Sequence, residues 1–556
     1  MTTQSSLHGL VGGFLRSADR FPDRKALVVG NQVVTYSGLK SEASRIAIAI
    51  ARFELEPYPL AAVFAHRSRI AYSGVLGVLI SGKGYVPLNP KLPVERTRRM
   101  LTLSGCRVLV VGNEAVHQLP ELLNGIDRSL TIIVPDISNA TDLAPLYPLH
   151  RFVTSAQFSE PGISALPDVS PSAVAYLLFT SGSTGQPKGV PISHLNVCSY
   201  IEYTCKRYEV TYNDRLSQEF DQTFDLSVHD MFVCWEQGAC LFCVPENSIM
   251  APAKFIRDNA LTIWFSVPSV IGTLSRLRLL QPNCFPSLRL SLFCGEPLPA
   301  TYARAWQEAA PNSILENLYG PTEATIAISN YRWGIGQPPR QCLNGIVPIG
   351  WIFDGQQSCV IDQQRRVLSA GGIGELCLFG SQVTTGYWGN PERTGEQFVH
   401  LSEDRESLWY RTGDLVKRDE SGCFFYLGRI DHQVKIRGHR VELQEIEEII
   451  RQVSGAAQVV SVPWPVRNGS AEGVVAFVCG LETGDPDRIL AYCRERLPEY
   501  MVPKKICSLS DAPLNANGKI DRQKLMQILG GAGDERRKQE ATDQLDRAMG
   551  AREHAV

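Results

Sequence analysis

The sequence lacks a strong excess of charge of either sign. Its 556 residues carry a formal net charge of −2, so the net charge does not indicate binding to nucleic acid or to an anionic membrane surface. No apolar run approaches the ~20 residues that a membrane helix needs. The N-terminus, MTTQSSLHGL, also lacks the basic and apolar regions of a signal peptide. We therefore expect a cytoplasmic protein with no nucleic-acid partner and no membrane insertion.

The sequence also lacks a regular cysteine framework. Fifteen cysteines, an odd number, are spread from Cys106 to Cys507, which indicates free thiols in a reducing compartment. The one close pair, Cys240 and Cys243, lies in the apolar run GACLFCV, and no second pair completes a zinc site. We interpret the pair as buried strand residues, with a metal or redox pair as the alternative.

The length and the apolar pattern predict two folded domains and a tail. A chain of 556 residues is too long for one hydrophobic core. Up to about residue 430, short β-branched runs such as Val108–Val111 and Thr131–Val134 alternate with amphipathic stretches, as in α/β layers with buried strands. We expect an α/β core domain over residues 1–430, a small mobile α+β domain over residues 431–529, and a charged tail over residues 530–556.

The most informative segment is TSGSTGQPKG, Thr180–Gly189, which directly follows the apolar strand AVAYLLF. Its glycines let backbone N–H groups approach oxyanions closely, and its hydroxyls and Lys188 add donors and charge. These features favour a polyphosphate cradle over a flexible linker. A second Gly-rich stretch, Gly77–Gly84, approaches the Walker A pattern but ends in glycine where that motif needs a hydroxyl. We interpret that stretch as a helix that ends in a Gly-rich turn.

Thr180–Gly189 resembles the phosphate loop of the adenylate-forming superfamily, which contains acyl-CoA synthetases, luciferases and the adenylation domains of nonribosomal peptide synthesis. Further motifs of this family follow in the family's order along nearly the whole chain. They are GKGYVPLNP (Gly82–Pro90), FDLSVHD (Phe224–Asp230), NLYGPTEAT (Asn317–Thr325), GELCLFGSQVTTGYWGNPERT (Gly374–Thr394), YRTGDL (Tyr410–Leu415), GRIDHQVKIRG (Gly428–Gly438) and NGKIDR (Asn517–Arg522).

The resemblance implies ATP and Mg²⁺ as cofactors and assigns their contacts. The reaction joins a carboxylate to the α-phosphate of ATP, so positive charge and fixed donors must offset the repulsion between two anions. Thr322 is implied at the α-phosphate, Glu323 at Mg²⁺, Asn317 and Tyr319 at the adenine, and Asp414 with Arg429 at the ribose. The phosphate loop contributes Thr180, Ser181, Gly182, Ser183, Thr184, Gly185 and Lys188.

Two residues of the small domain are implied in a two-step cycle. Lys519, on an Asn-Gly turn, would bridge the substrate carboxylate and the phosphate during adenylation; a surface-turn lysine is the alternative. Asp431 would be the hinge on which the small domain rotates before thioester formation. The rotated state would bring Lys435–Val441 toward the active site in place of Lys519.

Asp225 points to the substrate class. In FDLS it matches the aspartate that pairs with the α-ammonium of an amino acid, a contact that acyl-CoA ligases of the superfamily generally lack; an aspartate that caps a helix is the alternative reading. A buried carboxylate facing a buried ammonium is favourable only when both are present. The resemblance places Leu226, His229, Phe265, Leu292, Cys294, Leu318, Ile326 and Ala327 around the rest of the amino acid.

This lining is bulky, with only Ala327 small, which favours glycine and then alanine. The pattern resembles the D-alanine ligase of teichoic acid modification and the stand-alone glycine ligase of lipid A glycinylation. The sequence after NGKIDR contains no carrier attachment motif, so we expect transfer of the activated amino acid to the phosphopantetheine thiol of a separate carrier protein. An acyl-CoA ligase and a catalytically silent binding protein are the alternatives from other classes.

Overall fold

The computed structural model describes residues 8–139, 144–158, 166–182, 187–334, 342–401, 404, 406–431, 433–456, 458–467, 470–479, 486–510, 512–513 and 520–530. These residues form two compact units. The larger comprises the described parts of Met1–Ser181 and Pro187–Arg440, and the smaller those of Gly182–Gln186 and Val441–Val556. The fifteen cysteines, all within the described residues, are free thiols. No helix in these ranges is both long and apolar enough to cross a membrane.

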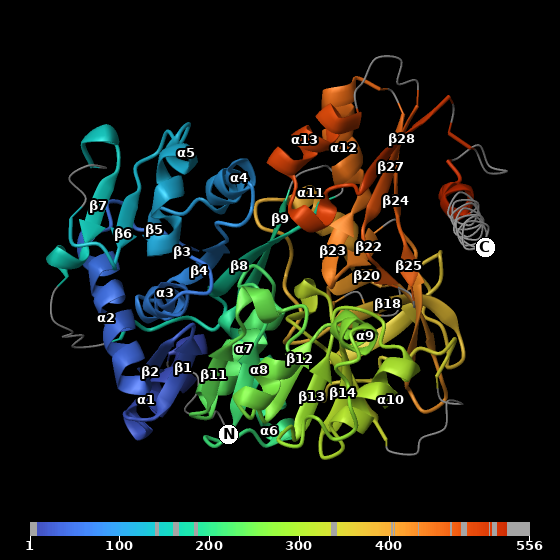
Figure 1. Cartoon of the computed structure of the whole chain (residues 1–556), viewed down its shortest axis with the longest axis horizontal. Coiled ribbons are helices and arrows are strands. Elements are labelled where there is room, and N and C mark those ends of the chain that lie inside the picture. The colour runs from blue at the N-terminus through green and yellow to red at the C-terminus, as the bar shows by residue number, and fades with distance from the viewer. Residues whose placement is uncertain are drawn as a thin grey trace, which may run out of the picture. The chain divides into compact units, whose positions relative to one another are not determined.

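The first layer of the larger unit is a mostly parallel sheet, which the described residues build from seven strands (Figure 1). In spatial order its strands are β7 Arg151–Thr154, β6 Thr131–Val134, β5 Val108–Val111, β3 Leu60–Phe64, β4 Gly84–Leu88, β8 Val174–Thr180 and β9 Lys188–Ser193. The surrounding helices are α2 Tyr36–Phe53, α3 Arg69–Ile80, α4 Val94–Ser104 and α5 Leu119–Leu123. Strands such as β3 and β5 are buried throughout, as expected for parallel strands covered on both faces.

The second layer positions the site. It is a sheet of nine strands in the described part of the chain, parallel from β1 to β14 and antiparallel at its edges. Its strands are β16 Trp351–Ile352, β15 Ser329–Trp333, β14 Ile314–Tyr319, β13 Leu290–Phe293, β12 Ile263–Ser266, β10 Arg215–Gln218, β11 Cys240–Cys243, β1 Lys25–Val29 and β2 Gln32–Thr35. Its helices are α1 Gly12–Arg20, α6 His194–Tyr208, α7 Leu226–Glu236, α8 Ala253–Asp258, α9 Pro268–Arg276 and α10 Ala300–Ala309.

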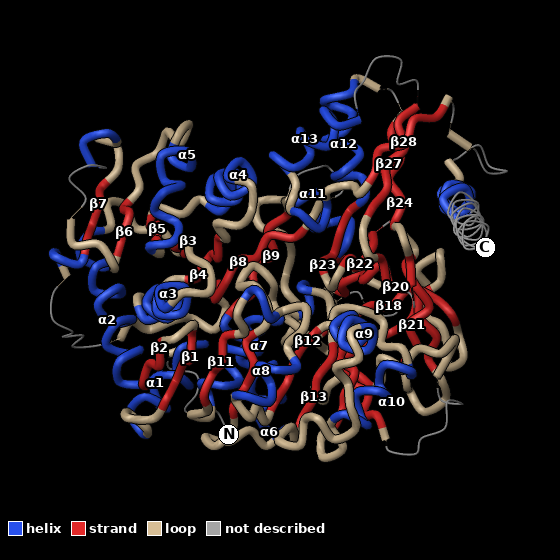
Figure 2. The backbone as a smooth tube through the Cα atoms, viewed as in Figure 1, coloured by secondary structure: helices blue, strands red, loops and turns tan. Residues whose placement is uncertain are grey.

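The remaining part of the larger unit is antiparallel. Its strands are β17 Gln357–Ile361, β18 Ile373–Phe379, β20 Trp409–Arg418, β19 Phe398–Val399 and β21 Phe424–Arg429, with helix α11 at Pro391–Gln397. A hairpin follows, made of β22 (Gln433–Ile436) and β23 (His439–Glu442). Figure 2 shows how helices and strands are interleaved through this unit.

The smaller unit has its own core. Its elements are α12 Leu443–Ser454, β24 Val459–Pro463, β25 Val466–Arg467, β26 Ser470–Ala471, β27 Val474–Cys479, α13 Pro486–Arg496 and β28 Lys505–Leu509. Ile446 and Ile450 of α12 are buried on one face, and Arg522 donates to Glu447 at 2.8 Å within the unit.

The expected fold class, a large α/β domain followed by a small α+β domain, is confirmed. The Gly77–Gly84 prediction also holds, because α3 ends at Ile80 and Gly82 adopts φ +81° before β4 begins. The hairpin residues up to Arg440 belong to the larger unit and the chain from Val441 onward to the smaller one, and the domain boundary at residue 431 stays a prediction. The pivot role of Asp431 stays a prediction.

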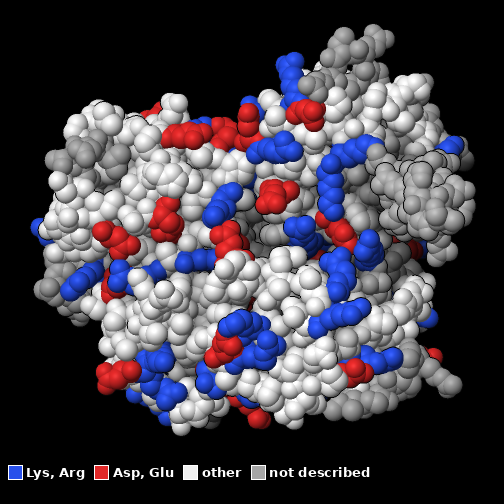
Figure 3. Space-filling view, viewed as in Figure 1, with Lys and Arg blue, Asp and Glu red and all other residues white. Residues whose placement is uncertain are grey.

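Acidic and basic residues are interspersed over the face of the molecule drawn in Figure 3. This distribution agrees with the formal charge of −2.

Candidate functional site

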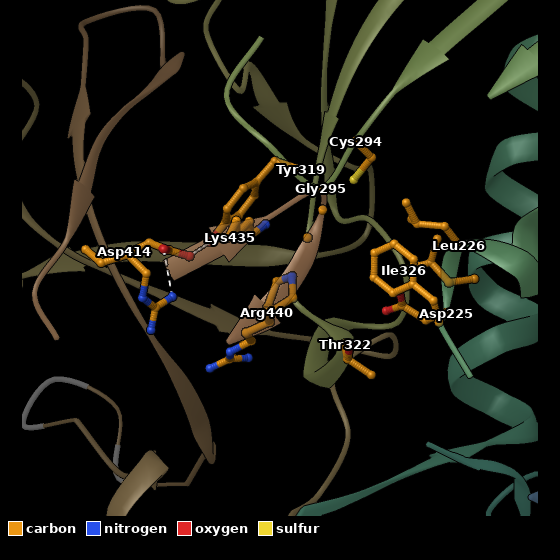
Figure 4. Close-up of a pocket in the computed structure, with 15 residues that line it drawn as sticks. Asp225, Leu226, Cys294, Gly295, Tyr319, Thr322, Ile326, Asp414, Lys435 and Arg440 are labelled. Carbon is orange, nitrogen blue, oxygen red and sulfur yellow. Dashed lines mark hydrogen bonds and ion pairs between the residues drawn. The ribbon is translucent and has the colours of Figure 1, made fainter. Parts of the chain in front are cut away.

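A cavity lies where β13, β14 and α7 converge, at the carboxyl ends of parallel strands. This edge is where ligands bind in open α/β sheets. The cavity has a volume of about 40 Å³, room for a few water-sized groups since one water needs about 10–15 Å³. Figure 4 shows Asp225, Leu226 and Ile326 on one side and Asp414 on the other, with Lys435 and Arg440 between them.

Asp225 is a buried carboxyl group in the wall of this cavity. It directly precedes α7, and its side chain makes no capping hydrogen bond to the helix. Its exposed fraction is 4%. Burial raises the pKa of Asp225 from 3.8 to about 7, against the opposing effects of a hydrogen bond with Thr322 and the charge of Lys435. Because burial makes the charged form of Asp225 unfavourable, a cationic ligand that pairs with the carboxylate is strongly preferred.

The apolar part of the cavity lining includes Leu226, Cys294 and Ile326, each about 1% exposed. The other predicted pocket residues are buried in the same core but do not line the cavity. These residues are His229, Phe265, Leu292, Leu318 and Ala327. The structure therefore places four of the nine predicted pocket residues, Asp225 included, in the lining of the cavity and the other five within the surrounding core.

The side of the site expected to hold the nucleoside carries a short hydrogen-bonded chain. Asp414, on β20, accepts from the Tyr319 hydroxyl at 2.5 Å and from Arg429 Nη1 at 2.8 Å. Arg429 also pairs with Asp431. Asn317 donates to the carbonyl of Pro348 at 2.9 Å, while its buried Oδ1 has no hydrogen-bond partner within the described structure. The unsatisfied Oδ1 of Asn317, two residues before Tyr319 on β14, fits a ligand that supplies an N–H group.

Glu323, in the turn Thr322–Ala324 after β14, is the centre of an ionic cluster. Its fully buried carboxylate accepts from Lys188 Nζ at 3.1 Å, from the Tyr387 hydroxyl at 2.8 Å and from Arg440 Nη1 at 2.9 Å. Burial alone would raise the pKa of Glu323, but Arg440 and Lys188 outweigh it and hold the pKa well below its usual range. The group is therefore ionised at neutral pH, the form that a magnesium ion requires.

The strands flanking the phosphate loop pair directly. Thr180 at the end of β8 faces Lys188 at the start of β9, and the Thr180 hydroxyl is buried without a partner in the described part of the chain. The Ser181 hydroxyl donates to the Arg440 carbonyl at 2.6 Å. In the described ranges, an unpartnered hydroxyl group therefore belongs to the residue that pairs with Lys188, which fits an oxyanion cradle.

Some predicted residues lie outside the described ranges, namely Ser183, Thr184 and Gly185 of the phosphate loop, and Lys519. Tyr387 and Arg440, both on Glu323, were not among the predicted contacts, and Phe224, Gly295, Gly320 and Pro321 line the cavity although no role was predicted for them. Arg440 lies in the segment Lys435–Val441, which was expected near the active site in one state of the two-step cycle. Tyr387 lies inside the motif that begins at Gly374, but nothing in the motif indicated its partner.

Comparison with known proteins gives a consistent result. The model of the AMP-binding enzyme family matches residues 14–388, and the model of the AMP-binding enzyme C-terminal domain matches residues 445–519. Zwittermicin A synthase ZmaJ of Bacillus cereus is 30% identical over 92% of this chain and 93% of its own length. Tyrocidine synthase 1 of Brevibacillus parabrevis is also 30% identical, but the chain spans only 45% of it and 13% of tyrocidine synthase 2.

A solved structure resembles the chain over nearly its full length. The Vibrio cholerae adenylation domain AlmE, in complex with glycyl-adenosine-5'-phosphate, is 34% identical and superposes with a TM-score of 0.85 over 96% of this chain and 99% of that one. The family models, the relatives and the site geometry agree. The chain belongs to the AMP-binding enzyme family of adenylate-forming ligases, and it is an adenylation domain of the nonribosomal-peptide-synthetase type.

Proposed function

We propose that this enzyme activates a small amino acid, with glycine favoured, as its aminoacyl-AMP. We further propose that it transfers the aminoacyl group to the phosphopantetheine thiol of a separate carrier protein. The observation that carries the proposal is Asp225, a buried carboxyl group at the closed end of a small cavity. The ammonium of an amino acid would neutralise that group, whereas a fatty or aryl acid would leave the charge buried and unpaired.

The preference for glycine rests on the wall behind Asp225. Leu226, Cys294 and Ile326 line the cavity beside Asp225 and are almost completely buried, so these bulky side chains leave little space for a substrate side chain. The resemblance to AlmE, solved with glycyl-adenosine-5'-phosphate, supports the same choice. Alanine of either hand is the next candidate, because it adds a single methyl group.

The first proposed step forms the mixed anhydride. A carboxylate oxygen of the amino acid attacks the α-phosphorus of ATP, the O–P bond forms, and the bond to the β-phosphate oxygen breaks as pyrophosphate leaves. Thr322 and Lys188 would hold the phosphates in line, which supplies orientation and positive charge where negative charge develops. Asp414 and Arg429 would hold the ribose, and Lys519 would bridge the carboxylate and the phosphate.

Glu323 is the residue that would hold Mg²⁺. A bound magnesium ion would neutralise charge on the phosphates. The ionised, buried carboxylate fits this role chemically, although Arg440 and Lys188 already pair with it. Magnesium would therefore have to share Glu323 with these cations or displace one of them.

The second proposed step consumes the adenylate. The carrier thiolate attacks the acyl carbon, a C–S bond forms, and the C–O bond to AMP breaks. In this step Lys435–Val441 would take the place of Lys519, with Asp431 as the pivot.

The test is amino-acid-dependent exchange of pyrophosphate into ATP, measured with each of the twenty amino acids, D-alanine and a set of fatty and aryl acids. The expected result is exchange with glycine and weaker exchange with alanine. A D-alanine preference would keep amino-acid activation and change the substrate. Exchange driven by a fatty acid and by no amino acid would overturn the proposal and favour an acyl-CoA ligase.

A further inference from the structure

A second layer of polar and aromatic side chains lies behind the closed end of the cavity. His229 follows Leu226 by three residues on α7, so the two side chains share one face of the helix. The His229 ring packs edge-on against Phe265, with centroids 4.6 Å apart. Leu226, Phe265 and Cys294 belong to one buried cluster. His229, with Phe265 packed against it, therefore lies one helical turn from Leu226 in the core that surrounds the cavity.

The imidazole of His229 is held by one specific partner. The hydroxyl of Tyr200, on α6, lies 2.7 Å from His229 Nδ1. Both residues are almost completely buried, with exposed fractions of 0% for Tyr200 and 1% for His229. Burial lowers the pKa of His229 to about 3, so the ring is neutral at physiological pH. The hydrogen bond then runs either from the Tyr200 hydroxyl to Nδ1 or from Nδ1–H to the hydroxyl oxygen, depending on the tautomer. Tyr200 does not line the cavity.

This hydrogen bond fixes the orientation of a ring that would otherwise turn. The χ2 torsion of a histidine is broad and roughly two-fold, and packing against Phe265 alone leaves the two ring faces nearly equivalent. The bond to Tyr200 selects one orientation, because turning the ring would take the buried Nδ1 of His229 away from this partner. If the His229 ring cannot turn, the residues packed in front of it can move less to make room for the methyl group of alanine than if the ring were free to turn.

We propose that Tyr200 is a positioning residue for amino-acid selection: its hydroxyl fixes the His229 ring and so keeps the wall behind Leu226 closed to side chains. The inference rests on the proposed function, because it explains how that site would reject a methyl group on the α-carbon. Tyr200 would act without touching the substrate.

The test compares Tyr200→Phe with Tyr203→Phe. Tyr203 lies one turn later on the same helix, and its hydroxyl accepts from Asn330 Nδ2 at 3.1 Å, so this control also removes one tyrosine hydroxyl bond but leaves His229 untouched. For each protein, kcat/KM for pyrophosphate exchange is measured with glycine, L-alanine and D-alanine, together with the thermal unfolding midpoint.

The expected result is a glycine-to-alanine ratio that falls by about 10-fold in Tyr200→Phe, the size of one buried hydrogen bond. The ratio should stay within about 2-fold of wild type in Tyr203→Phe. In a His229→Leu background, adding Tyr200→Phe should change the ratio by less than about 2-fold, because the residue through which Tyr200 acts is gone.

Three results would overturn the inference: an unchanged ratio in Tyr200→Phe, an equal fall in Tyr203→Phe, or a Tyr200→Phe protein that fails to fold while Tyr203→Phe folds. The last result would make the hydroxyl a determinant of folding rather than of selection. Failure of the proposed function is seen separately, as a wild-type enzyme that exchanges with neither glycine nor alanine.

Discussion

Replacing Asp225 with asparagine should make the protein more stable at neutral pH while it removes amino-acid activation. Burial raises the pKa of this carboxyl group from 3.8, its unfolded value, to about 7. The folded state therefore binds the proton more tightly, and stability falls as pH rises from about 3.8 to about 7. Above pH 7 the full cost is present, because the carboxylate is charged in both states.

The magnitude follows from the two pKa values. At about 1.4 kcal/mol per pH unit, the interval from 3.8 to about 7 corresponds to an upper limit on the order of 4 kcal/mol. Asparagine has nearly the same shape and no charge, so Asp225→Asn should recover this free energy at pH 8. At pH 5, about a third of the way from 3.8 to 7, the gain should fall to roughly a third of its value at pH 8.

The assay is thermal unfolding of wild type and Asp225→Asn at pH 8 and pH 5. With an unfolding entropy of about 2 cal/mol/K per residue, the expected Tm increase for the larger unit is roughly 4 °C at pH 8 and about 1–2 °C at pH 5. Asp19→Asn serves as the control, because that side chain is 70% exposed and should show no pH-dependent gain.

Glycine connects the stability effect to function. Glycine should raise the Tm of wild type, since a ligand that binds only the folded state stabilises it, and should leave the Tm of Asp225→Asn unchanged. Exchange with glycine should fall by about 10²–10³-fold in the variant, as when one partner of a buried ion pair is lost. The reasoning would be refuted if Asp225→Asn were less stable than wild type at pH 8. It would also be refuted if the Tm increase over wild type were the same at pH 8 and pH 5.

Three further predictions concern other parts of the site. Lys519→Ala should lose adenylation by about 10²–10³-fold but still transfer from chemically supplied glycyl-AMP to the carrier; equal loss of both half-reactions would contradict the two-state cycle. Phe265→Ala removes bulk behind the cavity wall and should raise kcat/KM for alanine relative to glycine by about 5-fold or more, whereas a wild type that prefers a large amino acid would show that the pocket is wrongly assigned. Arg440→Gln removes a cation from Glu323 and should lower the Mg²⁺ concentration for half-maximal exchange by about 5-fold, as measured by magnesium titration; an unchanged titration would mean that Arg440 and magnesium do not share Glu323.

The sequence predicted well those features that short motifs carry. Asp225, Thr322, Asp414 and Arg429 come from separate motifs and all line the cavity. Asp225 directly precedes α7, Thr322 follows β14, Asp414 lies within β20 and Arg429 ends β21, so regular elements fix where each residue lies. The alternation of buried strands and amphipathic stretches also predicted the α/β character of the larger unit.

The sequence predicted less well what depends on packing between distant segments. The depth of the pocket was one such feature: His229 and Phe265 belong to the expected lining, yet they pack against each other and neither lines the cavity. Tyr200 lies 29 positions from His229 in a helix without a functional motif, so no local pattern could identify it. The ion pair between Arg440 and Glu323 joins residues 117 positions apart and depends on how the hairpin folds back.

The most direct test of the central claim compares glycine, glycolate and acetate as substrates for pyrophosphate exchange. The three acids have nearly the same size and carry an ammonium, a hydroxyl and a hydrogen on the α-carbon. If Asp225 selects the ammonium, exchange should occur with glycine and fall by at least about 10²-fold with glycolate and acetate. Comparable exchange with all three acids would contradict the assignment of Asp225 and of amino-acid activation.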